Sequence, residues 1–212
     1  MPSPNPPRPA RQKNPSAPAT ARVRWRSAII GLTLAVITLG VFFPVVRCDF
    51  VSYDDPHYVL RNPPVQAGLT WNSIAWAFRA AHASNWHPVT WHSHMLDTEL
   101  FGNSPAGPHL VNLFLHTANT VLVFLLLQYL TGATWRSAAV AALFALHPLR
   151  VESVVWVSER KDVLCAFFGL LAVWMYALWV RNRKGQLSDD ALGRLGGRNF
   201  FTSFLSSASR SA

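Results

Sequence analysis

Between Arg26 and Arg47 the chain carries twenty consecutive residues without a charge, SAIIGLTLAVITLGVFFPVV. A helix rises about 1.5 Å per residue, so this run is long enough to cross a hydrocarbon core of about 30 Å. A cleaved signal peptide is the alternative reading. However, no small-x-small cleavage site follows, and the run exceeds the usual hydrophobic region of about 7–15 residues. We therefore predict a transmembrane helix over about 27–46.

Three further apolar runs predict spans over about 110–130, 134–149 and 163–180. The first of them contains four polar residues, Asn112, His116, Asn119 and Gln128. We expect these polar side chains to face other helices. The run at 134–149 is short, and it spans only if flanking residues extend its reach. The predicted fold is all-α, a multi-pass membrane protein with about four transmembrane helices.

The composition agrees with this class. Half of the residues are hydrophobic and 14% are charged, against roughly 25% charged in globular domains. The apolar half excludes a disordered chain, and two cysteines exclude a disulfide scaffold. A bond between Cys48 and Cys165 stays open, because nothing in their spacing shows that they meet.

The charges are distributed unevenly along the chain. Residues 1–26 hold six Arg or Lys and no acid, 47–162 hold seven against eight acids, and 181–212 hold six against two acids. Under the positive-inside rule the amino terminus is cytoplasmic, in the inner (plasma) membrane, and the loops 47–108 and 147–162 are extracytoplasmic. The membrane domain is then 27–180.

The two ends carry weaker signals. Residues 1–26 are predicted to be a disordered basic cytoplasmic arm that lies on anionic lipid headgroups. Nucleic-acid binding is disfavoured, since no aromatic residues are interleaved with the basic ones. The segment 181–212 has no spanning run and is expected to be a weakly folded or truncated cytoplasmic tail.

The long outer loop is predicted to carry two amphipathic helices. Thr70 can cap a helix whose apolar stripe is Trp71, Ile74, Ala75 and Phe78. Pro88 can begin a second helix, which Gly102 ends. The periodicity alone leaves open whether these helices lie along the membrane interface or pack on each other as a small lid.

An acidic doublet, Asp54 and Asp55, stands just outside the first span. Adjacent carboxylates repel one another, and burial raises the pKa of a carboxyl group, which suits a general base. The alternative is a solvated turn before Pro56.

The second outer loop mixes acids with cations. Arg160 and Lys161 are suited to a phosphate leaving group, because Arg makes bidentate contacts and Lys is a mobile point charge. Ordinary interfacial ion pairs with Glu152, Glu159 and Asp162, or a headgroup site, are the alternatives.

Four histidines, His82, His87, His92 and His94, lie within thirteen residues. Their spacing does not place three on one helical face, so we predict no metal site and expect them to flank the tryptophans. A single divalent ion held by Asp54 or Asp55 with a donor phosphate stays open.

Four strings carry a family resemblance: FVSYDDPHYVLRNPPVQAGLTW, ASNWHPVTWHSHMLDTELFG, GPHLVNLFLHTANTVL and ALFALHPLRVESVVWVSERKDVL. Over about 28–180 the chain resembles the amino-terminal part of bacterial proteins that join a GT-C-type glycosyltransferase membrane module to tetratricopeptide repeats. Those proteins are similar in turn to protein O-mannosyltransferases and to transmembrane and tetratricopeptide-repeat-containing proteins of animals.

The resemblance implies inverting transfer of a sugar from a polyprenyl-phosphate donor to a Ser/Thr hydroxyl of a protein acceptor, without a soluble cofactor. Asp54 or Asp55 would be the base, and Arg160, Lys161 and His147 would contact the donor phosphate. The two cations would be oriented by three acidic residues, Glu152, Glu159 and Asp162. The bound ligand would be covered by Trp86, His87 and Trp91.

The chain departs from the family pattern, because complete modules have many more spans followed by repeats. We therefore expect a truncated product. The competing hypothesis is a non-catalytic membrane anchor or a lipid-binding partner of a larger assembly.

Overall fold

The computed structural model describes residues 19–82 and 84–183, and the arm before residue 19 and the tail after 183 lie outside them. Within the described residues the regular structure is helical, apart from one β-bridge between His82 and Asn85. Helix α1 (Ala19–Phe42) continues into the 3-10 turn η1 (Phe43–Arg47). Residues 19–26, predicted as part of a disordered arm, are therefore helical, since Ala and Arg favour helix.

Three segments are long and apolar enough to cross a membrane: Arg24–Arg47, Ala106–Thr131 and Val157–Arg183. The all-α membrane class is thereby confirmed. Helix α5 is Ala106–Thr131, and α6 is Thr134–Leu146. The thirteen residues of α6 reach only about 20 Å, so the expected third span is short of a full crossing.

Pro148 follows the end of α6 and separates it from α7 (Arg150–Val155), because a residue before proline is driven out of the helical conformation. A 3-10 turn, η3 (Val157–Glu159), then leads into a last described helix over 160–183.

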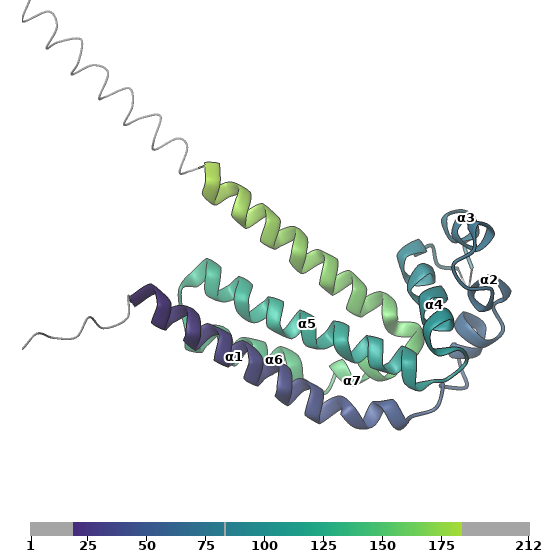
Figure 1. The fold of residues 1–212 in the computed structure, drawn as a ribbon, viewed down its shortest axis with the longest axis horizontal. Coiled ribbons are helices and arrows are strands. Elements are labelled where there is room, and N and C mark those ends of the chain that lie inside the picture. Colours follow the sequence, from purple (N-terminus) through teal and green to yellow (C-terminus); the bar gives the residue numbers. More distant parts are fainter. Residues whose placement is uncertain (1–18, 83, 184–212) are drawn as a thin grey trace, which may run out of the picture.

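Helices α1, α5 and α6 lie side by side (Figure 1). The start of α1 and the end of the helix over 160–183 point to the same end of the molecule, and α2, α3 and α4 cluster at the other end (Figure 1). Both predicted outer loops therefore emerge at one end of the bundle.

Polar side chains of α5 bind backbone carbonyls of its neighbours. His116 Nε2 donates to Ala145 O of α6 at 3.0 Å, and Asn119 Nδ2 donates to Val163 O at 2.9 Å. Asn112 Nδ2 donates to the carbonyls of Val154 and Trp156. The prediction that these residues face other helices is confirmed. The carbonyls of Ala145 and Val154 belong to the last turns of α6 and α7, where helical N–H donors are lacking, whereas Val163 lies within the helix over 160–183.

The outer module consists of a π-helical turn and three helices: η2 (Pro56–Leu60), α2 (Pro63–Gln66), α3 (Trp71–Arg79) and α4 (Pro88–Phe101). Its core joins Tyr58, Val65, Ala77 and Trp91, and the second outer loop contributes Val157. The helices thus pack on each other as a lid, and this lid includes part of the second loop.

Helix α3 begins as predicted, because the Thr70 side chain accepts a hydrogen bond from Ser73 N at 3.2 Å. The predicted apolar stripe is not the buried one, however. Trp71 is 86% exposed and Phe78 57% exposed, whereas Ala77 is buried and Trp76 packs on the core. The helix faces inward on the side that meets Trp91, a partner that periodicity alone does not identify.

Thr70→Ala is expected to destabilise α3 by about 1 kcal/mol, because an orphan N–H loses its side-chain acceptor. Faster amide hydrogen exchange confined to the first turn of α3 would show this. Asn72→Ala, an exposed position in the same first turn, is the control, and equal exchange in both variants would contradict the capping role.

Candidate active site

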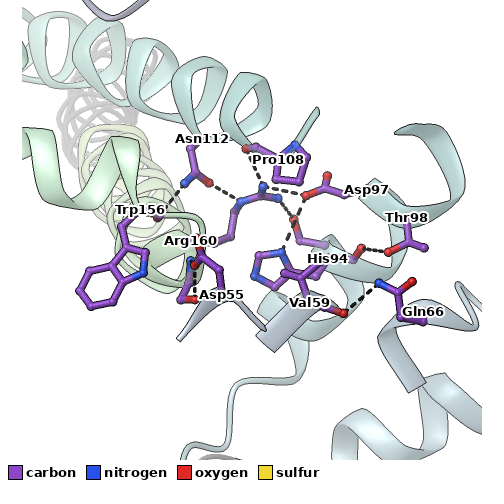
Figure 2. Close-up of polar contacts among 12 residues, drawn as sticks. Asp55, Val59, Gln66, His94, Asp97, Thr98, Pro108, Asn112, Trp156 and Arg160 are labelled. Atoms are coloured by element: carbon purple, nitrogen blue, oxygen red, sulfur yellow. Dashed lines mark hydrogen bonds and ion pairs between the residues drawn. The ribbon is translucent and has the colours of Figure 1, made fainter. Parts of the chain in front are cut away.

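The two outer loops meet at Asp55. Its Oδ1 accepts hydrogen bonds from the backbone N of Ser158, at 2.9 Å, and from the Ser158 hydroxyl. Its Oδ2 accepts from Val51 N at 2.8 Å, and the side chain is buried. Asp55 therefore ties the first loop to a residue 103 positions away (Figure 2).

Arg160 lies at the centre of a buried polar cluster (Figure 2). Its Nη2 pairs with Asp97 Oδ2 at 2.7 Å and donates to Pro108 O at 2.8 Å. Nη1 donates to Ser93 Oγ at 2.6 Å, and Nε donates to Asn112 Oδ1. The guanidinium thus holds α4 and α5 to the second loop.

This position corrects the role expected for Arg160. A phosphate contact needs an accessible guanidinium, but this one is fully buried and bonded within the protein. The sequence prediction missed Asp97 as its partner. A signal was present, because Asp97 follows the buried His94 by three residues and so shares its helical face.

Lys161 is the cation that stays near the surface. Its Nζ pairs with Glu159 Oε1 at 2.7 Å and lies 5.9 Å from the centre of the Tyr58 ring. The predicted neighbours Glu159 and Lys161 are therefore paired, and the orienting role of Glu159 stays a prediction.

The other three residues assigned to the second loop are exposed: His147, Glu152 and Asp162. In the described chain Arg160 pairs with Asp97 and Lys161 with Glu159, so Glu152 orients neither cation. Asp162 accepts from Ser153 Oγ, and His147 Nδ1 accepts from Leu149 N at the end of α6. Within the described part of the chain none of the three forms an ion pair or a hydrogen bond with Lys161, although the negative charge of Asp162 acts on it.

Asp54 differs from its neighbour. Its backbone carbonyl accepts from His57 N and Tyr58 N, which forms the turn into η2. Its side chain is half-buried, and within the described residues the carboxylate accepts no hydrogen bond. Of the two aspartates, Asp54 is the one with an available carboxylate.

Tyr58 connects Asp54 with Lys161. Burial raises the pKa of the Tyr58 hydroxyl, Lys161 opposes this shift, and the negative charge of Asp54 adds to it. Charges of both signs therefore act on one ring. We call Asp54, Tyr58, Glu159 and Lys161 the outer-loop site.

The three residues predicted to cover a ligand occupy different positions. Trp91 is fully buried and packs against Tyr58, with ring centres 5.0 Å apart, so it belongs to the core and cannot cover a ligand. Trp86 is exposed, and its Nε1 donates to Phe78 O at 2.9 Å. His87 stacks on Tyr58 beside the site. The histidines do flank the tryptophans, as His82 contacts both Trp76 and Trp91.

The structure bears on the disulfide and on the metal site. Both cysteines are free thiols. Within the described residues no three His, Cys, Asp or Glu side chains come together as a metal site.

The outer module is expected to loosen between pH 6.5 and 4. Burial, and then the charges of Lys161, His94 and His82, lower the pKa of His87 to about 4. An imidazole held neutral contributes stability above its unfolded pKa of about 6.5, and this is lost as the pH falls toward 4, by at most about 2 kcal/mol because solvent screens this partly exposed ring. Hydrogen exchange of the α4 amides at pH 7 and pH 4.5, each corrected for the intrinsic exchange rate, measures this loss of stability. His87→Gln should reduce the pH dependence, and the part that remains is assigned to His94 of the same helix, because burial also lowers the pKa of His94. An unchanged profile would contradict the contribution of His87.

The fold and site define an all-α membrane protein whose two outer loops form one polar centre beside the spans. Comparisons with known proteins identify relatives of the chain within this class. The chain is 33% identical to protein O-mannosyl-transferase Tmtc2 of Drosophila melanogaster over 170 residues, covering 76% of this chain and 17% of that protein. It is 32% identical to human protein O-mannosyl-transferase TMTC4, covering 78% of this chain and 25% of the relative.

The chain is thus protein O-mannosyl-transferase-like over about three quarters of its length, and the resemblance seen in the motifs is confirmed. It spans about a fifth of the length of these curated relatives. No family model and no solved structure matches it. The relatives named here are animal proteins, and a bacterial placement stays a prediction.

Proposed function

We propose that the chain takes part in protein O-glycosylation, in which a hexosyl group passes from a polyprenyl-phosphate-linked sugar to a Ser/Thr hydroxyl of a protein acceptor. The relatives' names favour mannose as the hexose. The observation that carries the proposal is the outer-loop site: Lys161 Nζ lies 5.9 Å from the centre of the Tyr58 ring, and the backbone of Tyr58 is hydrogen-bonded to Asp54, whose carboxylate is available, at the junction that Asp55 and Ser158 hold together.

The chemistry is an inverting displacement. The acceptor oxygen attacks the anomeric carbon while Asp54 takes the hydroxyl proton. The bond between the anomeric carbon and the phosphate oxygen breaks, and its electron pair leaves with the lipid phosphate. Lys161 stabilises the charge that develops on this phosphate. The reaction as written needs no soluble cofactor.

The remaining residues position these groups. Glu159 orients Lys161, and Arg160 fixes the start of the helix from which Lys161 projects. Asp55 holds the two loops in register. His87 stacks on Tyr58 beside the site, and we assign to it and to the exposed Trp86 the role of limiting the access of water, which competes with the acceptor.

The proposed location follows from the same arrangement. The outer loops face the extracytoplasmic side of an inner (plasma) membrane. The opposite end of the bundle, where the first span begins at Arg24 and the last ends at Arg183, faces the cytoplasm. Labelling of the exposed Cys48 by a membrane-impermeant thiol reagent from the outside tests this orientation.

The test of function uses the whole chain in vesicles with polyprenyl-phosphate-mannose and a Ser/Thr peptide. Mass spectrometry should detect a mannosylated peptide. An alanine peptide and guanosine-diphosphate mannose as donor are the controls. Correctly inserted protein that transfers nothing would favour the alternative, a non-catalytic membrane anchor or lipid-binding protein.

A further inference from the structure

Five arginines gather at the end of the bundle opposite the outer loops: Arg24, Arg26, Arg136, Arg181 and Arg183. We call this the arginine end. Figure 1 shows that the start of α1, the start of α6 and the end of the helix over 160–183 all lie there. Within the described chain every carboxylate belongs to residues 49–162, whose acids lie toward the outer loops, so this positive charge is not neutralised locally.

A hollow of about 210 Å³ opens at this end, between α1 and α6. Its lining is Arg26, Ile30, Thr134 and Trp135. Gln128 of α5 holds the two walls together, because its Nε2 donates to Ser27 Oγ at 2.7 Å and to Thr134 Oγ1 at 3.0 Å. The hollow is therefore built by side chains from three helices.

The hollow combines two kinds of surface. Arg26 and the Thr134 hydroxyl are polar, whereas Ile30 and the indole of Trp135 are apolar. A molecule that fits both surfaces carries an anionic group joined to a hydrocarbon part. Arg binds phosphate oxygens in a bidentate manner, and an exposed indole is at home where water meets hydrocarbon.

The ends of the candidate spans indicate where this hollow lies relative to the membrane. The first begins at Arg24, the second ends at Thr131 and the third ends at Arg183, so the arginine end coincides with a membrane boundary. Trp25 and Trp135 are each 71% exposed there. Arg183 lies over the ring of Trp179 at 5.1 Å, which holds a guanidinium at the same level.

We propose that the hollow binds the headgroup of an anionic phospholipid, with the phosphate on Arg26 and the upper acyl chain against Ile30 and Trp135. This site is separate from the outer-loop site and does not depend on the proposed glycosyl transfer. A free phosphate would leave the apolar half of the hollow uncovered, which favours the lipid as the occupant.

The test uses the full chain purified in detergent and offered equal amounts of phosphatidylglycerol and phosphatidylcholine. Native mass spectrometry should show preferential retention of phosphatidylglycerol. Arg26→Gln should reduce that preference about fivefold, as expected for one basic residue at an anionic surface, and Arg26→Lys should restore part of it. Arg79→Gln is the matched control, since Arg79 is an exposed arginine on α3 at the opposite end.

Three results would overturn the proposal. They are equal retention of both lipids by the unmodified chain, a preference that Arg26→Gln leaves unchanged, and displacement of phosphatidylglycerol by millimolar inorganic phosphate. An equal loss in Arg79→Gln would likewise show a general charge effect and no defined site.

Discussion

Asp54→Asn is expected to lower glycosyl transfer by about 10²–10⁴-fold while membrane insertion and thermal stability stay unchanged. The carboxylate is half-buried and accepts no hydrogen bond from the described residues, so its loss removes no contact that holds the fold. An amide cannot take the acceptor proton, and general bases contribute about this range. Initial transfer rates from polyprenyl-phosphate-mannose to a Ser/Thr peptide measure the effect.

Asp55→Asn is the matched control, because it makes the same change, one carboxylate oxygen to an amide NH2 group, in the neighbouring residue. It should weaken the junction of the loops, because an amide has only one acceptor oxygen, so the N–H of either Val51 or Ser158 would face an NH2 group that cannot accept. Its thermal midpoint should therefore fall with transfer. Normal transfer in Asp54→Asn, together with loss in a fully stable Asp55→Asn, would move the base to Asp55.

Arg160→Met should destabilise the protein by about 3–5 kcal/mol. The substitution leaves the Asp97 carboxylate buried without a countercharge, and it removes the donors to Pro108 O and Asn112 Oδ1. Breaking a buried pair by removing one partner has a cost of this size. Equilibrium unfolding in mixed detergent micelles, or the thermal midpoint at fixed detergent, reports it. Arg61→Met, at an exposed arginine, is the control.

A second variant separates the charge from the packing. In Arg160→Met with Asp97→Leu, neither charge of this buried pair remains, so a large part of the lost stability should return. A loss below about 1 kcal/mol in the single variant would show that the pair does not hold the loops to the bundle.

The sequence predicted the elements well because their signals are local. The length of an uncharged run measures a span, Thr70 and Gly102 mark helix ends, and the polar residues of α5 fall on the face that meets other helices. Helix α6 ends at Leu146 because His147 precedes Pro148, and a residue before proline disfavours the helical conformation. How far this segment crosses the membrane depends on how the whole bundle packs.

The site was predicted only in part. The motifs named both aspartates of the first loop and the cations Arg160 and Lys161 of the second, and Lys161 and Glu159 do lie next to each other. The assignment of Arg160 to a phosphate and of Trp91 to a ligand cover was wrong, since both side chains are fully buried. Asp97 and Tyr58 were not assigned a role.

The sequence by itself determined the membrane class, the helix ends and the residue types available at the outer loops. Only the tertiary structure decided which carboxylate and which cation are available. Adjacent residues such as Asp54 and Asp55 have the same local signal, and their roles diverge because Asp55 meets Ser158 from the far end of the chain. Burial and pairing depend on such distant contacts, which no local pattern encodes.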